Sequence, residues 1–242
     1  MFDAGPVTAR RAFVDLHCHT NASFDSLSNP ARVARIAAAR GLTHLAITDH
    51  DRIDGALRAR DAAPTGLTIL VGEEIRTREG DLIGLFLDEP VPPGLSAAEA
   101  ILAVRGQGGL VGIPHPFDRF RGSLLRDETM IAVAAEADWI EGHNARLIGS
   151  GNERAAALAR ELARPAVAVS DAHTLIEVGT ASTALDGDPS TPAGLLAALA
   201  GRIDLQPGRG SILLRAVTPM AKLIQLVRGN GRIRPVDHPV AR

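Results

Sequence analysis

The chain has 242 residues, a formal net charge of −2 and a hydrophobic content of 45%. Its length fits one large domain or two small ones, and this hydrophobic content is enough to form a buried core. The near-neutral charge excludes a strong global attraction to nucleic acid or to a membrane surface. The single cysteine, Cys18, excludes an internal disulfide framework.

Two further features concern location and partners. The first residues lack the apolar run of a signal peptide, and no apolar stretch is long enough to span a bilayer, so we expect a cytoplasmic protein without a membrane partner. Aromatic residues make up 3% of the chain and tyrosine is absent. Because no basic stripe interleaved with aromatics is visible, we expect no strong nucleic-acid-binding surface. The oligomeric state stays open.

Short apolar runs alternate with Ala- and Arg-rich segments along most of the chain. The apolar runs predict seven strands, at residues 12–17, 44–48, 68–72, 82–87, 110–114, 139–141 and 166–170. The segments between most of them predict helices at residues 30–40, 96–105, 127–135 and 152–163. Strands separated by helices in this way indicate an α/β fold with a mostly parallel sheet, either open or closed into a barrel.

The chain changes character after Gly187. The stretches TPAGLLAALAGR and TPMAKLIQLVRG predict helices that pack on the outside of the preceding part. The final NGRIRPVDHPVAR is expected to be loosely ordered. We therefore expect a first domain over residues 1–186 and a C-terminal helical extension, packing on it, over residues 187–242.

Most of the histidines follow predicted strands. In parallel α/β folds the carboxyl ends of the strands meet at one face, and active sites form there. Residues two apart on a strand share a face, so the pair in DLHCHT can point to one place, as can Asp171 and His173 in SDAH. The histidines placed in this way are His17, His19, His50, His115, His143 and His173.

Carboxylates accompany several of these histidines. LVGEEIRT ends the third predicted strand with Glu73 and Glu74, and only one of these can face the site because neighbouring strand residues alternate faces. WIEGHNAR places Glu141 and His143 on one face. Asp25 follows the first pair of histidines within a turn.

Imidazole together with carboxylate suits Zn²⁺, Mn²⁺ or Fe²⁺. The chain holds more such residues than one ion can use, so we expect two or three divalent ions of Mn, Zn or Fe. A single motif has ordinary explanations: a hydrogen-bonded pair would account for His17 and His19, and a turn hydrogen bond for Asp25. The several strand ends that carry histidine or paired carboxylates favour a metal cluster, because buried charges need partners or metals.

Two assignments stay open. His143 either ligates or packs beside the site, and in the second case Asn144 is the ligand. Arg119, Arg121 and Arg146 lie just past ligand-bearing strand ends, where an anion would bind. Ordinary solvated arginines are the alternative, because arginine is common in this chain.

The stretches DLHCHT, AITDHD, LVGEEI, GIPHP, IEGHNAR and SDAH, in this order, resemble the polymerase and histidinol phosphatase (PHP) family of metal-dependent phosphoesterases. The likeness runs over about residues 13–180. It implies a distorted seven-stranded (β/α) barrel, here residues 1–186, with a two- or three-metal site at the carboxyl ends of the strands. We expect no inserted second domain of the kind that some nucleotide-cleaving family members carry.

The resemblance also implies which residues hold each ion. One ion is held by His17, His19, Glu74 and Asp171. Glu74 bridges to a second ion, which His115 holds together with His143 or Asn144. The third ion is held by Asp25, His50 and His173. Glu74 is preferred over Glu73 because family members resemble Gly-x-Glu here, and Gly72 sets that register.

The expected reaction is hydrolysis of a phosphate ester by a hydroxide that bridges two ions. Asp171, His173 and His50 are the expected catalytic residues, and His50 or His173 could position or protonate the leaving group if the third ion is absent. Arg119, Arg121 or Arg146 would bind the remaining phosphoryl oxygens.

The expected substrate is a small phosphomonoester, a nucleoside monophosphate or a nucleic-acid 5′ end. Histidinol phosphate is the alternative within this class. A non-catalytic metal-binding module and an amidohydrolase-like barrel are alternatives of other classes. The latter usually carries a bridging lysine late in the barrel, whereas Lys222 lies far outside the motif region.

Overall fold

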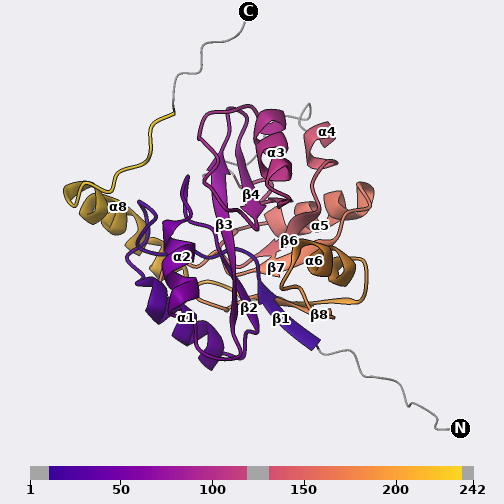
Figure 1. Ribbon diagram of the computed structural model, residues 1–242, viewed down its shortest axis with the longest axis horizontal. Helices are drawn as coiled ribbons and strands as arrows, with labels where there is room; N and C mark the ends of the chain where they lie inside the picture. Colours follow the sequence, from indigo (N-terminus) through magenta and orange to yellow (C-terminus); the bar gives the residue numbers. More distant parts are fainter. Residues whose placement is uncertain (1–10, 119–130, 236–242) are drawn as a thin grey trace, which may run out of the picture.

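The computed structural model describes residues 11–118 and 131–235 (Figure 1). The strands are β1 (Arg11–Asp15), β2 (His44–Ile47), β3 (Thr68–Arg76), β4 (Asp81–Leu85), β5 (Leu110–Ile113), β6 (Trp139–Asn144), β7 (Ala166–Val169), β8 (Ser182–Asp186) and β9 (Ile203–Gln206). The helices are α1 (Pro30–Ala39), α2 (Asp54–Asp61), α3 (Ala97–Gly106), α4 (Ile131–Ala134), α5 (Gly151–Glu161), α6 (Pro192–Leu199), α7 (Ile212–Arg215) and α8 (Val217–Val227).

All seven predicted strands are present, and the capping signals act as expected. The Asn29 side chain accepts a hydrogen bond from the Arg32 N–H at the start of α1, where Pro30 is the first helical residue. Ser96 and Glu99 form a capping box on α3. Part of the helix predicted at residues 127–135 lies outside the described residues, and α4 covers its end.

The strands form one mixed sheet in the order β7-β6-β5-β4-β3-β2-β1-β8-β9. The expectation of a mostly parallel sheet is wrong: β4 runs antiparallel to both β3 and β5, and β8 runs antiparallel to β1 and β9. β4 reverses because β3 continues into a tight hairpin, in which Thr77 N–H donates to the Gly80 carbonyl.

The sheet curls into a nearly closed barrel, which confirms the expected distorted barrel fold. At the carboxyl ends of β1 and β7, the Asp171 N–H donates to the His17 carbonyl and the His19 N–H donates to the Ala172 carbonyl, both at 2.9 Å. The Ala168 N–H donates to Thr183 Oγ1 at 2.8 Å and so joins β7 to β8. β7, at one end of the strand order, therefore meets β1 and β8, and β1 to β7 enclose a common interior.

The barrel interior is apolar below the site and tightly packed. Val14, Leu70, Ile83 and Trp139 are all buried there. A Cβ atom on Gly112 would lie 2.1 Å from Trp139 Cε2, so β5 needs glycine where β6 places its indole.

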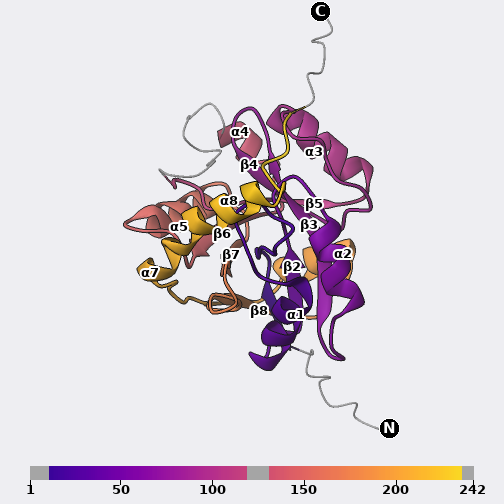
Figure 2. The same cartoon turned by 90° about the vertical axis from the view of Figure 1, so that its left-hand side faces the viewer.

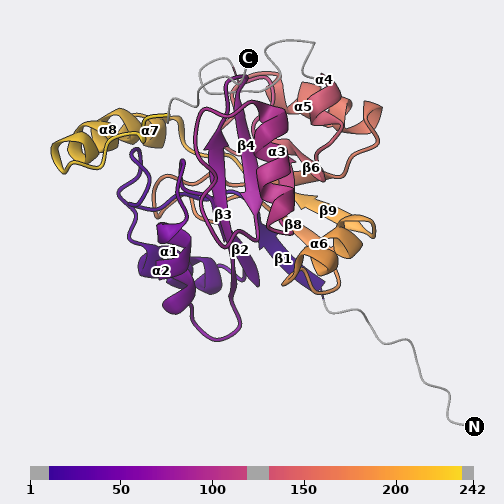
Figure 3. The ribbon, with the colours of Figure 1, turned by 45° about the horizontal axis from the view of Figure 1, so that its top comes forward.

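The helices cover the outside of the barrel. Figures 1 and 3 place α6 and α8 on opposite sides of it, and Figure 2 looks onto the face that α8 crosses. The part of the chain after Gly187 holds α6, α7 and α8 and also strand β9, which the sequence did not reveal and which pairs with β8. The division between residues 186 and 187 stays a prediction. Among the described helices, none is long and apolar enough to cross a membrane.

Gly112→Ala should destabilise the fold by about 1–3 kcal/mol, because the added methyl group overlaps Trp139 in a filled interior. The free energy of unfolding from urea titration measures this. Gly106→Ala at the end of α3 is the matched control, since nothing lies within 4 Å of its added Cβ. Equal stability of the two variants would contradict this account of the barrel interior.

Candidate metal centre

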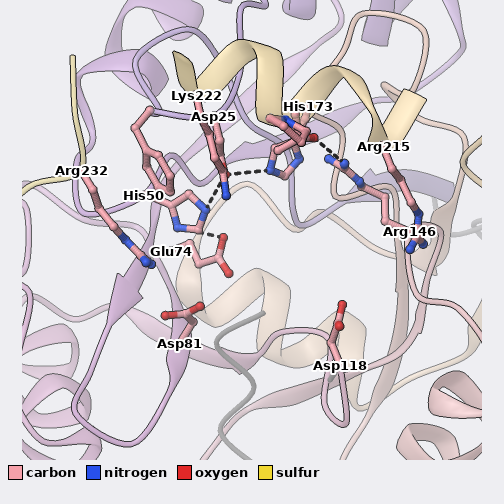
Figure 4. Close-up of a pocket in the computed structure, with 13 residues that line it drawn as sticks. Asp25, His50, Glu74, Asp81, Asp118, Arg146, His173, Arg215, Lys222 and Arg232 are labelled. Carbon is pink, nitrogen blue, oxygen red and sulfur yellow. Dashed lines mark hydrogen bonds and ion pairs between the residues drawn. The ribbon is translucent and has the colours of Figure 1, made fainter. Parts of the chain in front are cut away.

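A cavity of about 540 Å³ opens at the barrel end where β1, β2 and β3 finish. Figure 4 shows Asp25 between His50 and His173, with Glu74 beside His50. Its lining residues are Phe24, Asp25, His50, Glu74, Asp81, Asp118, Arg146, His173, Arg215, Thr218, Pro219, Lys222 and Arg232.

Glu74 on β3 lies at the middle of the cluster and is 1% exposed. Its Oε1 lies 2.9 Å from His115 Nε2. Its Oε2 lies 3.3 Å from the Nε2 atoms of His17 and His19 and from His50 Nδ1. Four imidazoles from different parts of the chain therefore surround one buried carboxylate.

Asp171 lies on the far side of the two histidines that follow β1. Its Oδ1 is 3.6 Å from His17 Nε2 and 3.5 Å from His19 Nε2. The two Nε2 atoms are 3.0 Å apart, so both imidazoles point at the same space between Glu74 and Asp171. This is the arrangement of ligands that share one cation.

Asp25 joins the remaining two histidines. Its Oδ2 lies 3.3 Å from His50 Nε2 and 3.3 Å from His173 Nε2. The Ser23 hydroxyl donates to Asp25 Oδ1 at 2.7 Å and orients the carboxylate. The loop after β1 therefore brings Asp25 into the cluster.

The donor atoms fit a cluster of divalent cations. Imidazole nitrogens and carboxylate oxygens within 4.8 Å of one another occur in four overlapping groups. Buried Nδ1 atoms of His19 and His115 have no hydrogen-bond partner among the described residues. So many buried ionisable groups are costly unless they are paired with one another or with cations. The groups are His17, His19 and Glu74; His17, His115 and Asp171; His19, Asp25, His50 and His173; and Glu74, Asp81 and His115.

The buried carboxylates of the cluster are held in their ionised form. Burial acts to raise the pKa of Glu74, but the facing His50 and His17 hold it well below its usual range. Burial likewise opposes ionisation of Asp25, and His50 and His173 nevertheless keep its pKa well below the ordinary value. Burial, with the charges of Arg146 and His19, lowers the pKa of His173 to about 3. Burial also acts to lower the pKa values of His17, His19 and His50, but the facing carboxylates raise all three, that of His50 to about 10. Protonated imidazoles therefore compensate the carboxylates, and a bound cation would replace those protons.

Two ligand positions hold unusual backbone conformations. Asp171 has φ of 52° and His115 has φ of 28°, both in the left-handed region. Such conformations cost of order 1–3 kcal/mol and persist where surrounding contacts enforce them. The bond from the Asp171 N–H to the His17 carbonyl, at 2.9 Å, enforces the first.

The preference for Glu74 over Glu73 agrees with the geometry. Glu73 points away from the cluster, and its Oε2 accepts a hydrogen bond from the Val91 N–H at 2.9 Å. Glu74 shares the inward face of β3 with Leu70, which lies in the barrel interior.

His143 does not reach the cluster. A β-bulge between Glu141 and His143 adds a residue to β6, so that His143 pairs with Ala168, whose side chain lies outside the barrel interior. His143 Nε2 lies 2.7 Å from the Gly208 carbonyl oxygen. The expectation that Glu141 and His143 share a face is therefore wrong.

Asn144 is directed inward instead, because it pairs with Val169 of the barrel interior. Its Nδ2 donates to Glu141 Oε2 at 2.8 Å and to Asp171 Oδ2 at 3.0 Å. Its Oδ1 accepts from the Arg146 N–H at 2.9 Å. Asn144 thus orients two carboxylates.

Glu141 has a larger role than the sequence suggested. Its Oε1 lies 2.6 Å from His17 Nδ1, and its Oε2 accepts from the His115 N–H at 2.7 Å. A carboxylate on one imidazole nitrogen fixes the tautomer and leaves the other nitrogen to bind metal. The stretch IEGHN indicated that β6 contributes to the site. Only the bulge shows that Glu141, and not His143, is directed inward from this strand.

Of the three expected phosphate-binding arginines, the structure describes one. Arg119 and Arg121 lie outside the described residues. Arg146 lines the cavity, is 6% exposed, and lies with its Nε 3.5 Å from Glu177 Oε1. Its second contact is a hydrogen bond from Nη2 to Thr218 Oγ1 at 2.8 Å.

The C-terminal extension completes the cavity, which the sequence did not reveal. Arg215, Lys222 and Arg232 line the wall above the cluster (Figure 4). The Phe24 ring lies 5.2 Å from Lys222 Nζ and 5.1 Å from Arg232 Cζ, so it contacts both cations. The cavity therefore pairs a histidine–carboxylate floor with a cationic wall.

Glu141→Gln should lower metal affinity about 10–100-fold, because an amide supports the required His17 tautomer less well. Titration of the metal-free protein with Mn²⁺, followed calorimetrically, measures the affinity. Glu136→Gln, at an exposed position just before the same strand, should leave it unchanged. Unaltered affinity in Glu141→Gln would contradict the orienting role.

Comparisons with known proteins agree with this fold. The PHP-associated (PHP_C) family model matches residues 149–202. An uncharacterized protein of Methanocaldococcus jannaschii is 39% identical over 114 residues, which are 43% of this chain and 67% of that protein. A 5′-3′ exoribonuclease of Haemophilus influenzae is 33% identical over 117 residues, and the match spans 43% of this chain and 42% of the exoribonuclease.

Solved structures share the barrel at low sequence identity. A two-domain protein from Bacteroides vulgatus, containing a predicted PHP-like metal-dependent phosphoesterase, is 18% identical with a TM-score of 0.69, over 84% of this chain and 66% of that one. The lesion-specific endonuclease PfuEndoQ of Pyrococcus furiosus is 16% identical with a TM-score of 0.62, over 81% of this chain and 58% of that one. With the matched family model and the barrel in common, this chain belongs to the PHP family.

Proposed function

We propose that this protein is a metal-dependent hydrolase of phosphate esters that works with two or three divalent ions of Mn, Zn or Fe. One observation carries the proposal: a single cavity joins a buried histidine–carboxylate cluster to a wall of cationic side chains. The cluster suits cations, and the wall suits an anion held against them. A phosphate ester meets both requirements.

Divalent ions in such a cluster, when bound, neutralise phosphoryl oxygens and lower the pKa of water. The ligand set that supports this consists of His17, His19, Glu74, Asp171, His115, Asp25, His50 and His173. His143, the remaining expected ligand, is directed elsewhere.

The residues of this chain have separate tasks in the proposed reaction. Arg146 would bind phosphoryl oxygens, because its guanidinium lines the cavity and is held in place by Glu177 and Thr218. His50 and His173 line the cavity wall and would orient the leaving group from there. Asp171 would fix the two histidines after β1 from the side opposite Glu74.

The proposed substrates are a small phosphomonoester, a nucleoside monophosphate or a nucleic-acid 5′ end. The cavity of about 540 Å³ has room for a nucleotide-sized ligand. The relative that is a 5′-3′ exoribonuclease supports the inclusion of nucleic-acid ends. Histidinol phosphate is a further member of the same chemical class.

The deciding experiment is elemental analysis of the purified protein together with phosphate release. The substrates are p-nitrophenyl phosphate, nucleoside monophosphates, histidinol phosphate and a 5′-phosphorylated oligonucleotide, each with added Mn²⁺ and with chelator. We expect two or three ions per chain and chelator-sensitive release from at least one substrate. Bound ions without release from any substrate would overturn the hydrolase proposal in favour of a non-catalytic metal-binding module.

His17→Ala should lose both metal and activity while the fold is kept, because His17 contacts Glu74 and lies near Asp171. Elemental analysis, phosphate release and circular dichroism measure the three quantities. Asp171→Asn should behave in the same way. Full turnover by purified, metal-depleted His17→Ala would contradict the assignment of His17 as a metal ligand.

Lys222→Ala should raise the KM for a phosphorylated substrate about 5-fold, which corresponds to about 1 kcal/mol for one partly screened charge. The ion content should not change, because Lys222 is a cation of the cavity wall, with its Nζ 5.2 Å from the Phe24 ring, and belongs to none of the candidate ligand groups. Steady-state kinetics measure the KM. Arg228→Ala, an exposed cation at the end of α8 outside the cavity lining, is the matched control and should leave KM unchanged.

A further inference from the structure

Helices α7 and α8 form one nearly continuous rod on the outside of the barrel. Ala216, which lies between them, has φ of −64° and ψ of −19°, within the range of helical residues. Figures 2 and 3 show the two helices in line at the edge of the molecule. The side chains of residues 212–227 can therefore be assigned to the sides of a single helix.

One side of this rod packs against the barrel. Ala221 is 1% exposed and Gln225 is 3% exposed. The Gln225 amide donates to three carbonyl oxygens of the loop at residues 21–26, at 2.8–3.0 Å. These contacts fix which side of α8 faces inward.

The opposite side carries an apolar stripe that the described part of the chain leaves uncovered. Its large side chains are Leu213, Met220, Leu223 and Val227, which are 53–82% exposed. Together with the exposed Ala216 they repeat at intervals of three and four residues, which is the spacing of a helix–helix seam. A helix that is apolar on two sides is normally covered on both, so this stripe marks an interaction surface.

The charge pattern around the stripe bears on what covers it. The flanking positions are Val217, Pro219, Ile224 and Leu226, none of which is charged. A seam that selects a different helix normally does so through complementary charges at these positions. Two copies of this stripe can face each other without bringing like charges together. An anionic lipid surface would call for cations beside the stripe, whereas Lys222 lines the cavity.

The area of the stripe also fits a second copy of the chain. Its four large side chains and the flanking Leu226 expose roughly 350 Å² of apolar surface per copy, at about 100 Å² for a whole side chain of this size. Because interfaces are about 60% apolar, two stripes with their polar rim would bury roughly 1,200 Å². This is the lower limit for specific protein–protein interfaces.

We propose that a second copy of this chain docks on the stripe, so that the protein forms a two-fold symmetric dimer through α7 and α8. In such a dimer each copy presents the same surface to the other. The dimer does not depend on the proposed hydrolase function, but it would hold from outside the helix whose inner side contacts the loop of Asp25. With this area we expect a dissociation constant in the micromolar range.

The first test is sedimentation velocity of the unsubstituted protein over concentrations that bracket this dissociation constant. We expect a reversible monomer–dimer equilibrium, which Leu223→Glu weakens at least about 10-fold because it places a charge inside the seam. Leu102→Glu is the matched control: Leu102 is a 71% exposed leucine on α3, and its substitution should leave the equilibrium unchanged. A protein that is monomeric at every concentration, or equal dimerisation of the two variants, would overturn the proposal.

Cross-linking tests where the two copies meet. Met220 lies at the middle of the stripe, so Met220→Cys should be joined to its own copy by a short bis-maleimide. Leu102→Cys should stay uncross-linked, and the native Cys18 does not compete because it is buried. A dimer that Met220→Cys does not cross-link would place the interface elsewhere and contradict the proposal.

Vesicles of phosphatidylcholine and phosphatidylserine distinguish a second copy from a lipid surface. We expect the unsubstituted protein not to co-sediment with them. Binding that Leu223→Glu abolishes, in a protein that is monomeric in solution, would assign the stripe to a lipid surface and overturn the dimer. Ion content and phosphate release decide the proposed function separately.

Discussion

The structure depends on how the negative charge of Glu74 is compensated at the end of the barrel where β3 finishes. The carboxylate is 1% exposed, and a lone buried carboxylate would cost several kcal/mol. Four imidazoles approach it within 3.3 Å, from the ends of β1, β2 and β5. Because these histidines come from separate strand ends, the cluster exists only when the sheet has curled, and the chemistry of the site is a consequence of barrel closure.

Barrel closure in turn depends on backbone hydrogen bonds that lie at the site itself. The bonds that join β1 to β7 involve His17, His19, Asp171 and Ala172, three of which carry the proposed ligands. The left-handed backbone at Asp171 aims its carboxylate inward immediately after β7 ends. Fold and site therefore share the same few contacts. A substitution that weakens the hydrogen bonds between the ends of β1 and β7 would affect both.

Local patterns were sufficient to predict β1 to β7, because each strand follows directly from its apolar run, whereas β8 and β9 were not predicted. Most histidines and carboxylates of the cluster were found as the residues that follow these runs. Alternation along one strand indicated that only one of Glu73 and Glu74 can face the site, and the resemblance to Gly-x-Glu selected Glu74. The bulge that turns His143 outward could not be predicted, since it depends on how β6 pairs with β7. The direction of β4 is equally non-local, because it depends on how β4 pairs with β3 and β5.

Helix α8 connects the cationic wall of the cavity to the loop that carries Asp25. Gln225 of α8 is 3% exposed, and its Nε2 lies 2.8–3.0 Å from the carbonyl oxygens of Asn21, Ser23 and Ser26. This loop carries Asp25, and one turn earlier on α8 Lys222 lines the cavity. Because one helix both clamps the loop of a proposed ligand and supplies a cation to the wall, a displacement of α8 would alter substrate binding and ion binding together.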